Sequence, residues 1–175
     1  MPANIPYLRA SDVQLAKWRP RLAGRLPHVA LAWSGRATHV NDRNRSLSLS
    51  QLEPLLAAED VRFVSVQREL RAADAALLTR EPRITHIGGE LADFTDTAAV
   101  LSTVDLLICV DTSIAHLAGA LGRPAWVLLP FQPDWRWTLD RERSPWYPDA
   151  RLFRQGADGD WTPVIARLAA ETAYI

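Results

Sequence analysis

The sequence is poor in sulfur, with one cysteine, Cys109, and one methionine among 175 residues. A single cysteine excludes an internal disulfide. Cys109 lies in the apolar run 106–110, where a thiol that is buried behaves as a small hydrophobe. This pattern is typical of a protein in a reducing compartment, so we expect a cytoplasmic location.

Net charge and long apolar runs are also missing. Twenty basic residues balance twenty acidic ones, which removes the simplest electrostatic argument for nucleic acid or an anionic membrane as a partner. No run approaches the roughly 18 apolar residues of a membrane-spanning helix, and the first residues lack the pattern of a signal peptide. We therefore expect no nucleic-acid partner and no membrane span.

Several motifs of well-known catalytic and cofactor sites do not occur. No Gly-x-Gly-x-x-Gly follows the first predicted strand and there is no Gly-Lys-Ser/Thr loop, which disfavours a dinucleotide site and a P-loop. No Cys/His spacing indicates zinc, and no Gly-x-Ser-x-Gly elbow indicates a hydrolase. These patterns predict neither a bound metal nor a cofactor.

What the sequence does contain is typical of one folded domain with a lead-in. Hydrophobic residues make up 48% and charged residues 23% of the chain, close to the averages for globular domains. Four of the twelve prolines lie in the first 27 residues, so residues 1–27 are interpreted as an N-terminal arm with one short helix at 11–18. Residues 28–175 then form the domain.

Apolar runs alternate with helical patterns through the rest of the chain. The predicted strands are 28–33, 61–66, 84–87, 105–110, 125–129 and 151–153, and the predicted helices are 50–58, 69–79, 98–102, 113–121 and 161–172. Thr95 or Asp96 is expected to cap the third helix, and Gly122 to end the fourth. Continuous apolar strands in this order predict an α/β fold, a Rossmann-like parallel sheet with helices on both faces.

The densest polar group follows the strand 105–110, and it comprises Asp111, Thr112, Ser113 and His116. Ligands of open parallel sheets bind beyond the carboxyl ends of the strands, and the free amides of a helix N-terminus attract phosphate. His116 lies about one turn after Ser113 and can donate to the same phosphate. Asp111 is better suited to orient the loop by accepting backbone or hydroxyl hydrogen bonds, with a direct ligand or catalytic role as the alternative. The alternatives are an ordinary helix cap and a structural histidine.

Two further segments each allow two interpretations. Arg43 and Arg45 belong either to a solvated charged loop or to a clamp that closes over a diphosphate. The segment 130–148 holds three of the seven tryptophans, which either form a lid over the edge of the core or stack on a base or sugar.

The block VDTSIAHLAGALGRPAWVLLP, followed by DWRW, SPWYP and RLFRQ, resembles the C-terminal glycosyltransferase-like domain that follows tetratricopeptide repeats in many bacterial proteins. That domain is similar to the heptosyltransferases (glycosyltransferase family 9) and, more distantly, to O-linked N-acetylglucosamine transferase. WSG, NDRNRS, SVQRE and DFTDTA occur in the family's order, and the resemblance extends from about residue 28 to the end. It implies the C-terminal half of a glycosyltransferase-B fold, which binds its donor without a metal.

The resemblance also implies roles for individual residues. The donor-phosphate positions correspond to Ser34, Gly35, Arg45, Asp111, Thr112, Ser113 and His116, with Arg45 standing where heptosyltransferases tend to have lysine. Nucleoside or lid contacts are expected from Gln67, Pro130, Asp134 and Trp135. The general base is expected in an N-terminal domain that this sequence does not contain, so no catalytic residue is assigned here.

These implications lead to one expected function and two alternatives. We expect the donor-binding domain of a metal-independent glycosyltransferase that uses a nucleotide-diphosphate sugar and is inactive as this isolated chain. Its partners would be the nucleotide-sugar donor and an N-terminal glycosyltransferase half or a tetratricopeptide-repeat region, in cis or as a separate chain. The alternatives are a non-catalytic protein-interaction module that uses the Trp-rich surface, and a sensor of a sugar nucleotide.

Overall fold

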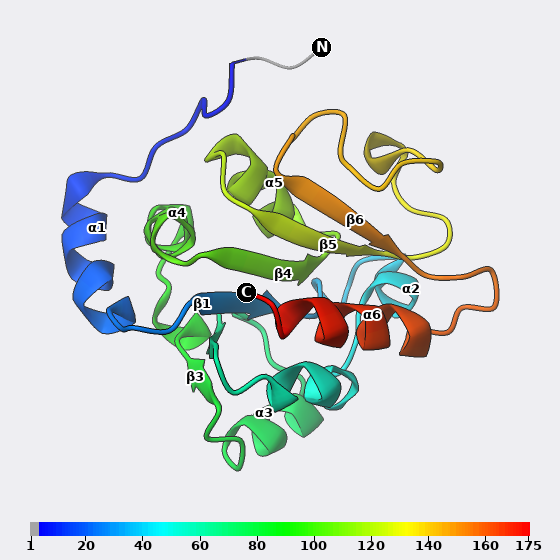
Figure 1. Ribbon diagram of the computed structural model, residues 1–175, viewed down its shortest axis with the longest axis horizontal. Helices are drawn as coiled ribbons and strands as arrows, with labels where there is room; N and C mark the ends of the chain where they lie inside the picture. The colour runs from blue at the N-terminus through cyan, green and yellow to red at the C-terminus, as the bar shows by residue number, and fades with distance from the viewer. Residues whose placement is uncertain (1–3) are drawn as a thin grey trace.

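The computed structural model describes residues 4–175, and residues 1–3 of the predicted arm lie outside the described part. Six strands form one parallel sheet in the order β3-β2-β1-β4-β5-β6 (Figure 1). They are β1 (His28–Ala32), β2 (Arg62–Ser65), β3 (Ile84–His86), β4 (Leu106–Val110), β5 (Ala125–Leu129) and β6 (Ala150–Arg154). The predicted Rossmann-like α/β fold is confirmed. Strand order reverses between β1 and β4, which places the expected ligand crevice beyond their carboxyl ends.

Helices cover both faces of the sheet, as expected (Figure 1). One face carries α1 (Asp12–Trp18), α4 (Phe94–Thr103) and α5 (Ser113–Ala120), and the other carries η2 (Leu49–Ala57), α3 (Ala72–Leu78) and α6 (Thr162–Thr172). Short helical turns complete the chain: η1 (Arg19–Leu22), α2 (Asp42–Arg45), η3 (Gly88–Glu90) and η4 (Trp135–Trp137).

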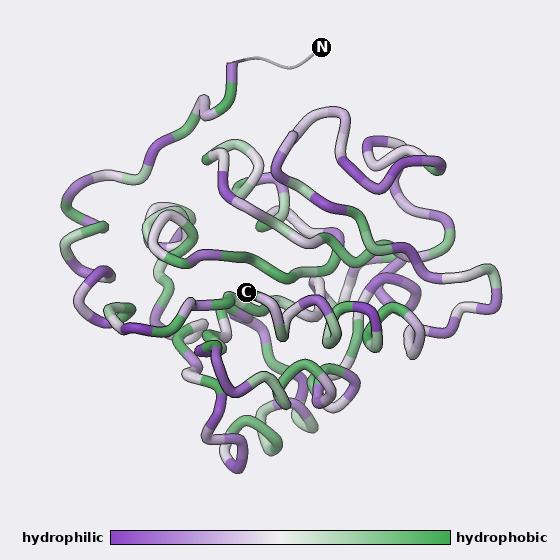
Figure 2. Tube along the Cα trace, in the orientation of Figure 1, coloured by the Kyte–Doolittle hydropathy of each residue, from purple (hydrophilic) through white to green (hydrophobic). Residues whose placement is uncertain are grey.

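Each central strand contributes to two separate cores. In β1, Ala30 and Ala32 pack under α4 and α5, whereas Val29 and Leu31 pack toward η2 and α6. Successive side chains of a strand point to opposite faces, so a strand that is covered on both sides is apolar throughout, as the coloured trace shows (Figure 2). Full burial of one Val or Leu side chain contributes about 1.5–3 kcal/mol. Cys109 is buried in the first core, as predicted.

Three local predictions differ from the structure. The helix predicted at 50–58 is a 3-10 helix that contains Pro54, a residue that lacks the N–H an α-helix interior requires. The helix predicted at 69–79 begins only at Ala72. The α4 cap is neither Thr95 nor Asp96: the Asp93 carboxylate accepts from both backbone amides, at 2.8 and 3.3 Å. Gly122 follows α5 with φ 63°, as the sequence predicted.

The lead-in helix α1 begins after its cap Ser11 and packs against α4. Trp18 is fully buried, and its indole N–H donates to the Asp96 carboxylate at 2.7 Å. The same Asp96 oxygen accepts from Lys17 Nζ at 2.8 Å. Residues 12–22 therefore form an additional layer over α4. Within residues 4–175, none of the helices has the length and apolar character needed to cross a membrane.

Candidate functional site

The carboxyl ends of β1 and β4 bring together the segments that were predicted to bind a donor. Two cavities open there, and Thr112 and Ser113 line both. The β2-side cavity, of about 180 Å³, is lined by Ala32, Ser34, Gly35, Arg36, Val66, Gln67, Arg68, Glu69, Asp93, Phe94, Thr97, Thr112, Ser113 and Ile114. The β5-side cavity, of about 500 Å³, is lined by His39, Asn41, Arg45, Asp111, Thr112, Ser113, His116, Gln132, Pro133, Asp134 and Arg136.

The N-terminus of α5 separates these two cavities. Thr112 is the N-cap residue of α5, yet no side chain caps the helix. The Thr112 hydroxyl turns back instead and donates to the Val110 carbonyl at 3.4 Å. An ordinary helix cap, one of the alternatives from the sequence, is therefore not present. The first-turn amides and the positive end of the helix dipole are available to an anion.

The turn after β1 is held by the side chain of Gln67, which follows β2. Gln67 is buried, its Oε1 accepts from the Ser34 amide at 3.1 Å, and its Nε2 donates to the Ser34 carbonyl at 2.9 Å. Nε2 also donates to the Glu69 carbonyl at 3.1 Å. Gln67 therefore lines the β2-side cavity, but its side-chain amide is used to fix the Ser34 backbone. The exposed Glu69 carboxylate lines the same cavity and is the nearby acceptor for a ligand.

Arg45 reaches across the crevice from α2 to the end of β4. Its Nη1 donates to the Asp111 carbonyl at 2.8 Å, whereas its Nε is buried without a protein partner. The guanidinium lies directly against Gly35. Arg43, the other arginine of this loop, is exposed and lines neither cavity. The structure thus brings Arg45, and not Arg43, to the site.

A polar network fixes the loop that carries Arg45. The Gly35 amide donates to Ser46 Oγ at 2.9 Å, and this hydroxyl donates to the Asp42 carboxylate at 2.6 Å. Arg71, which precedes α3, forms an ion pair with the other Asp42 oxygen at 2.6 Å. A buried carboxylate with two such partners is well compensated, so the loop 35–46 is closed by its own hydrogen bonds and tied to the start of α3.

His116 lines the β5-side cavity from the second turn of α5. Its ring stacks on Trp137 with centroids 5.0 Å apart, and its Nδ1 lies 3.2 Å from the Tyr147 hydroxyl. Burial lowers the pKa of His116, and the nearby Asp111 carboxylate partly opposes this shift. The imidazole is therefore neutral near pH 7, with one N–H donor.

Asp111 orients the Trp-rich segment 130–148. The Trp137 indole N–H donates to Asp111 Oδ1 at 2.8 Å, and the Trp137 side chain is fully buried. The expectation that Asp111 organises a loop by accepting hydrogen bonds matches this contact, although the donor is an indole and not a backbone amide or a hydroxyl.

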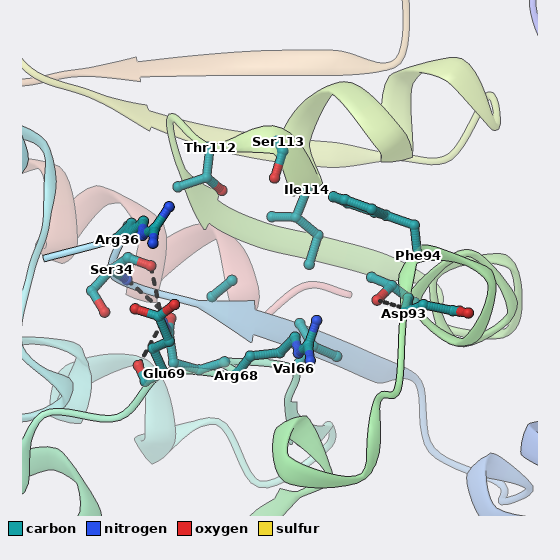
Figure 3. Close-up of a pocket in the computed structure, with 14 residues that line it drawn as sticks. Ser34, Arg36, Val66, Arg68, Glu69, Asp93, Phe94, Thr112, Ser113 and Ile114 are labelled. Atoms are coloured by element: carbon teal, nitrogen blue, oxygen red, sulfur yellow. Dashed lines mark hydrogen bonds between the residues drawn. The ribbon is translucent and has the colours of Figure 1, made fainter. Parts of the chain in front are cut away.

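The β2-side cavity combines charged and apolar side chains, as the close-up shows (Figure 3). Thr112 and Ser113 lie at one side, Ser34 and Glu69 at another, and Phe94 closes the end at the start of α4. The Phe94 side chain is 58% exposed, which is unusual for a large aromatic group. An exposed apolar ring at one end and the Glu69 carboxylate at another suit a nucleoside, whose base stacks and whose ribose hydroxyls donate.

Other predicted contacts divide between the crevice and its surroundings. Asp134 lines the β5-side cavity, where it accepts from Arg136 Nη1 at 2.8 Å. Trp135 is 69% exposed and packs edge-to-face on Trp146. Pro130 is buried, and like Trp135 it lines neither cavity. The Trp-rich segment is therefore mixed, with Trp137 under the site and Trp135 outside it.

Sequence reasoning missed several side chains that the fold brings to the site. Glu69, Asp93 and Phe94 line the β2-side cavity, and His39 and Arg136 line the β5-side cavity. Asp93 and Phe94 belong to the segment DFTDTA, whose position at the carboxyl edge was the available signal. Within the described residues, no three His, Cys, Asp or Glu side chains gather in a group that could hold a metal.

Comparison with known proteins finds similarity to glycosyltransferases in sequence and in fold. Residues 54–129 match the model of glycosyltransferase family 9 (heptosyltransferase). The chain is 31% identical over 181 residues to protein FlbA of Caulobacter vibrioides, an alignment that covers 96% of this chain and 29% of FlbA. The match to the glycosyltransferase family 9 model thus covers less than half of this chain and includes β2, β3, β4 and β5.

Solved structures share the fold. E. coli ADP-heptose lps heptosyltransferase II superposes with a TM-score of 0.65 at 18% identity, covering 97% of this chain and 54% of that one. The C-terminal domain of a group 1 family glycosyl transferase (LpcC) from Francisella tularensis gives a TM-score of 0.52 at 11% identity, covering 95% and 92%. The fold is therefore the Rossmann-like fold of glycosyltransferase-B proteins, and the chain spans about half of the heptosyltransferase and under a third of FlbA.

Proposed function

We propose that this chain is the donor-binding domain of a glycosyltransferase that uses a nucleotide-diphosphate sugar. One observation carries the proposal: the Ser34–Gly35 turn, the Arg45 guanidinium and the first turn of α5 converge at the switch point of the sheet. Backbone donors, a cation and a neutral histidine donor face the same space, which is the arrangement that a diphosphate requires.

The two cavities suggest how the donor lies. The diphosphate rests on the first turn of α5, which borders both cavities. The nucleoside occupies the β2-side cavity, where Phe94 offers a stacking surface and Glu69 offers an acceptor for ribose hydroxyls. The sugar then extends into the β5-side cavity beside His116 and Asp134.

In the reaction an acceptor hydroxyl attacks the anomeric carbon, and the bond from that carbon to the diphosphate oxygen breaks. The nucleoside diphosphate leaves with both bonding electrons, so negative charge develops on the oxygen that faces α5. Arg45, the α5 amides and the Nε2–H of His116 stabilise that charge, because donors fixed before the reaction need no reorganisation. No step on this side of the bond requires a metal.

The acceptor proton must pass to a base, and we place that base in an N-terminal half beyond this chain. The lengths of the aligned structures support this assignment: this chain covers 54% of heptosyltransferase II but 92% of the isolated C-terminal domain of LpcC. The isolated chain should therefore bind donor without completing transfer. A tetratricopeptide-repeat region is a second candidate for the adjoining segment.

The experiment is calorimetric titration of the purified chain with ADP, GDP, UDP and CDP and their sugars, first with EDTA and then with magnesium. ADP-sugars come first, because ADP-heptose is named with the E. coli relative. Saturable binding in EDTA supports the proposal. Absence of binding across the panel contradicts it.

A non-catalytic interaction module is the second candidate, and the exposed pair Trp135 and Trp146 favours it. Such a module would bind none of the nucleotides in the panel. Its double variant W135A/W146A would no longer bind the protein partner. A sugar-nucleotide sensor would bind like the donor domain, yet show no transferase activity once joined to its N-terminal segment.

A further inference from the structure

Tyr147 belongs to the SPWYP segment, and it contacts the helix that carries His116. Its hydroxyl oxygen lies 3.2 Å from His116 Nδ1, and its ring meets the histidine ring edge-on with centroids 5.8 Å apart. Tyr147 lines neither cavity. It therefore meets the site through His116, and its ring also packs against Trp137 with centroids 6.3 Å apart.

The sequence of α5 provides the space for this contact. Gly119 lies three residues after His116, on the same helix face. A Cβ at position 119 would lie 2.3 Å from the Tyr147 ring carbons, so only glycine lets the ring pack on the helix backbone. The motif His-x-x-Gly therefore contains both His116 and the glycine that leaves room for the Tyr147 ring.

The SPWYP turn holds Tyr147 from the other side. The Ser144 hydroxyl is buried and accepts from the backbone amides of Trp146 and Tyr147, each at 3.2 Å. Trp137 stacks on the His116 ring, and its carbonyl accepts from Arg154 at 2.9 Å. His116 is thus packed against two aromatic rings that also contact each other, with centroids 6.3 Å apart.

Both groups are neutral, and their relative acidities favour one direction of the hydrogen bond. Burial lowers the pKa of His116, so its ring is neutral and has one acceptor nitrogen and one N–H. Burial, with a smaller effect of the Tyr7 hydroxyl, raises the pKa of Tyr147 to about 12, so the phenol keeps its proton. A phenol is a stronger acid than a neutral imidazole N–H, and it is the favoured donor.

We infer that Tyr147 is a positioning residue, whose hydroxyl donates to Nδ1 of His116 and thereby fixes the tautomer that carries its proton on Nε2. The hydrogen bond at one ring nitrogen sets the proton on the other. The inference rests on the proposed function in one respect: the Nε2–H is the donor offered to the diphosphate.

The test begins with the free protein. Long-range ¹H–¹⁵N spectra of the imidazole nitrogens at neutral pH report which nitrogen of His116 carries the proton. We expect the Nε2–H form in the wild type and a mixture of both tautomers in Tyr147→Phe. Gly119→Ala displaces the ring by another route and should give the same mixture. Tyr174→Phe, at a side chain that is 90% exposed, is the matched control and should match the wild type.

Nucleoside diphosphate affinity is the second readout. Loss of one oriented hydrogen bond predicts a Kd about 5-fold higher in Tyr147→Phe, and no further loss when Tyr147→Phe is added to His116→Ala. A wild-type proton on Nδ1, or an unchanged tautomer in Tyr147→Phe, would overturn the inference. A wild type that shows the Nε2–H form but binds no nucleotide would instead contradict the proposed function alone.

Discussion

The Arg45 guanidinium lies so close to Gly35 that a Cβ at position 35 would stand 2.7 Å from Arg45 Nη2. The glycine of the WSG motif and the second arginine of NDRNRS are therefore parts of one arrangement, although ten residues separate them in sequence. The hydrogen bond from Arg45 to the Asp111 carbonyl extends this arrangement to β4. The segments that follow β1 and β4 are thus joined by one guanidinium.

Arg45→Ala should weaken nucleoside diphosphate binding about 10- to 100-fold, because hydrogen bonds to charged groups contribute about 1.5–3 kcal/mol each. Arg43→Ala is the matched control: it comes from the same loop, is exposed and lines neither cavity. Calorimetric titration measures both variants. Equal losses in the two would mean that only the net charge of the loop matters.

Gly35→Ala should reduce nucleotide affinity about 10-fold while leaving the melting temperature nearly unchanged. The added methyl group displaces the guanidinium, which is the far end of a flexible side chain, and does not press on backbone. Gly89→Ala serves as the comparison, since nothing lies within 4 Å of its Cβ position. Wild-type affinity in Gly35→Ala would show that the guanidinium position is unimportant.

Asp96→Ala should lower the free energy of unfolding by about 2–3 kcal/mol, because Lys17, the Trp18 indole and the Ala92 amide all donate to this buried carboxylate. The loss should free the lead-in from α4. Urea denaturation followed by tryptophan fluorescence measures it. Asp60→Asn, in an exposed turn, should change stability by less than about 0.5 kcal/mol. Equal stability of both variants would contradict the docking of α1.

Stability should fall on mild acidification. Burial lowers the pKa of His86 and of His116 below the ordinary value of 6.5. Their contribution is therefore complete above pH 6.5 and is lost as the pH falls through the folded-state pKa values, because the unfolded chain takes up protons first. Around His116, Asp111 and Asp134 oppose this shift and Arg136 reinforces it.

Unfolding free energies at about pH 7.5 and about pH 5 check this expectation, a window above the titration of most carboxylates. The double variant H86Q/H116Q should lose less stability across the window than the wild type does. His39→Gln, at an exposed position, should behave as the wild type. A wild type whose stability rises toward pH 5 would reverse the sign and exclude the two histidines as its cause.

The sequence was sufficient for the centre of the sheet because β1, β4 and β5 are buried on both faces and so are almost continuously apolar. The helix at 50–58 was less predictable, since Pro54 favours a 3-10 geometry that apolar spacing does not reveal. Asp93 was missed as the α4 cap because Thr95 and Asp96 are equally good capping residues.

The site was predictable where one segment carries it, as in Asp111 to His116. It was not predictable where separate segments meet. The local sequence does not indicate that Arg45 contacts Asp111 and Arg43 does not. Which arginine points to the site depends on how the turn of α2 lies over Gly35. The Tyr147 contact is of the same kind, since 31 residues separate it from His116. The individual donor contacts remain predictions.

The central claim is that the diphosphate binds at the first turn of α5, and backbone amide spectra recorded during titration with a nucleoside diphosphate test it most directly. The account predicts that the largest shifts fall on the amides of Ser113, Ile114 and Gly35, and that His116→Ala reduces them at equal ligand concentration. Two results would contradict it. One is a set of shifts confined to another surface, such as the separate cavity lined by the arginines 141, 143 and 151. The other is the absence of shifts at saturating nucleotide.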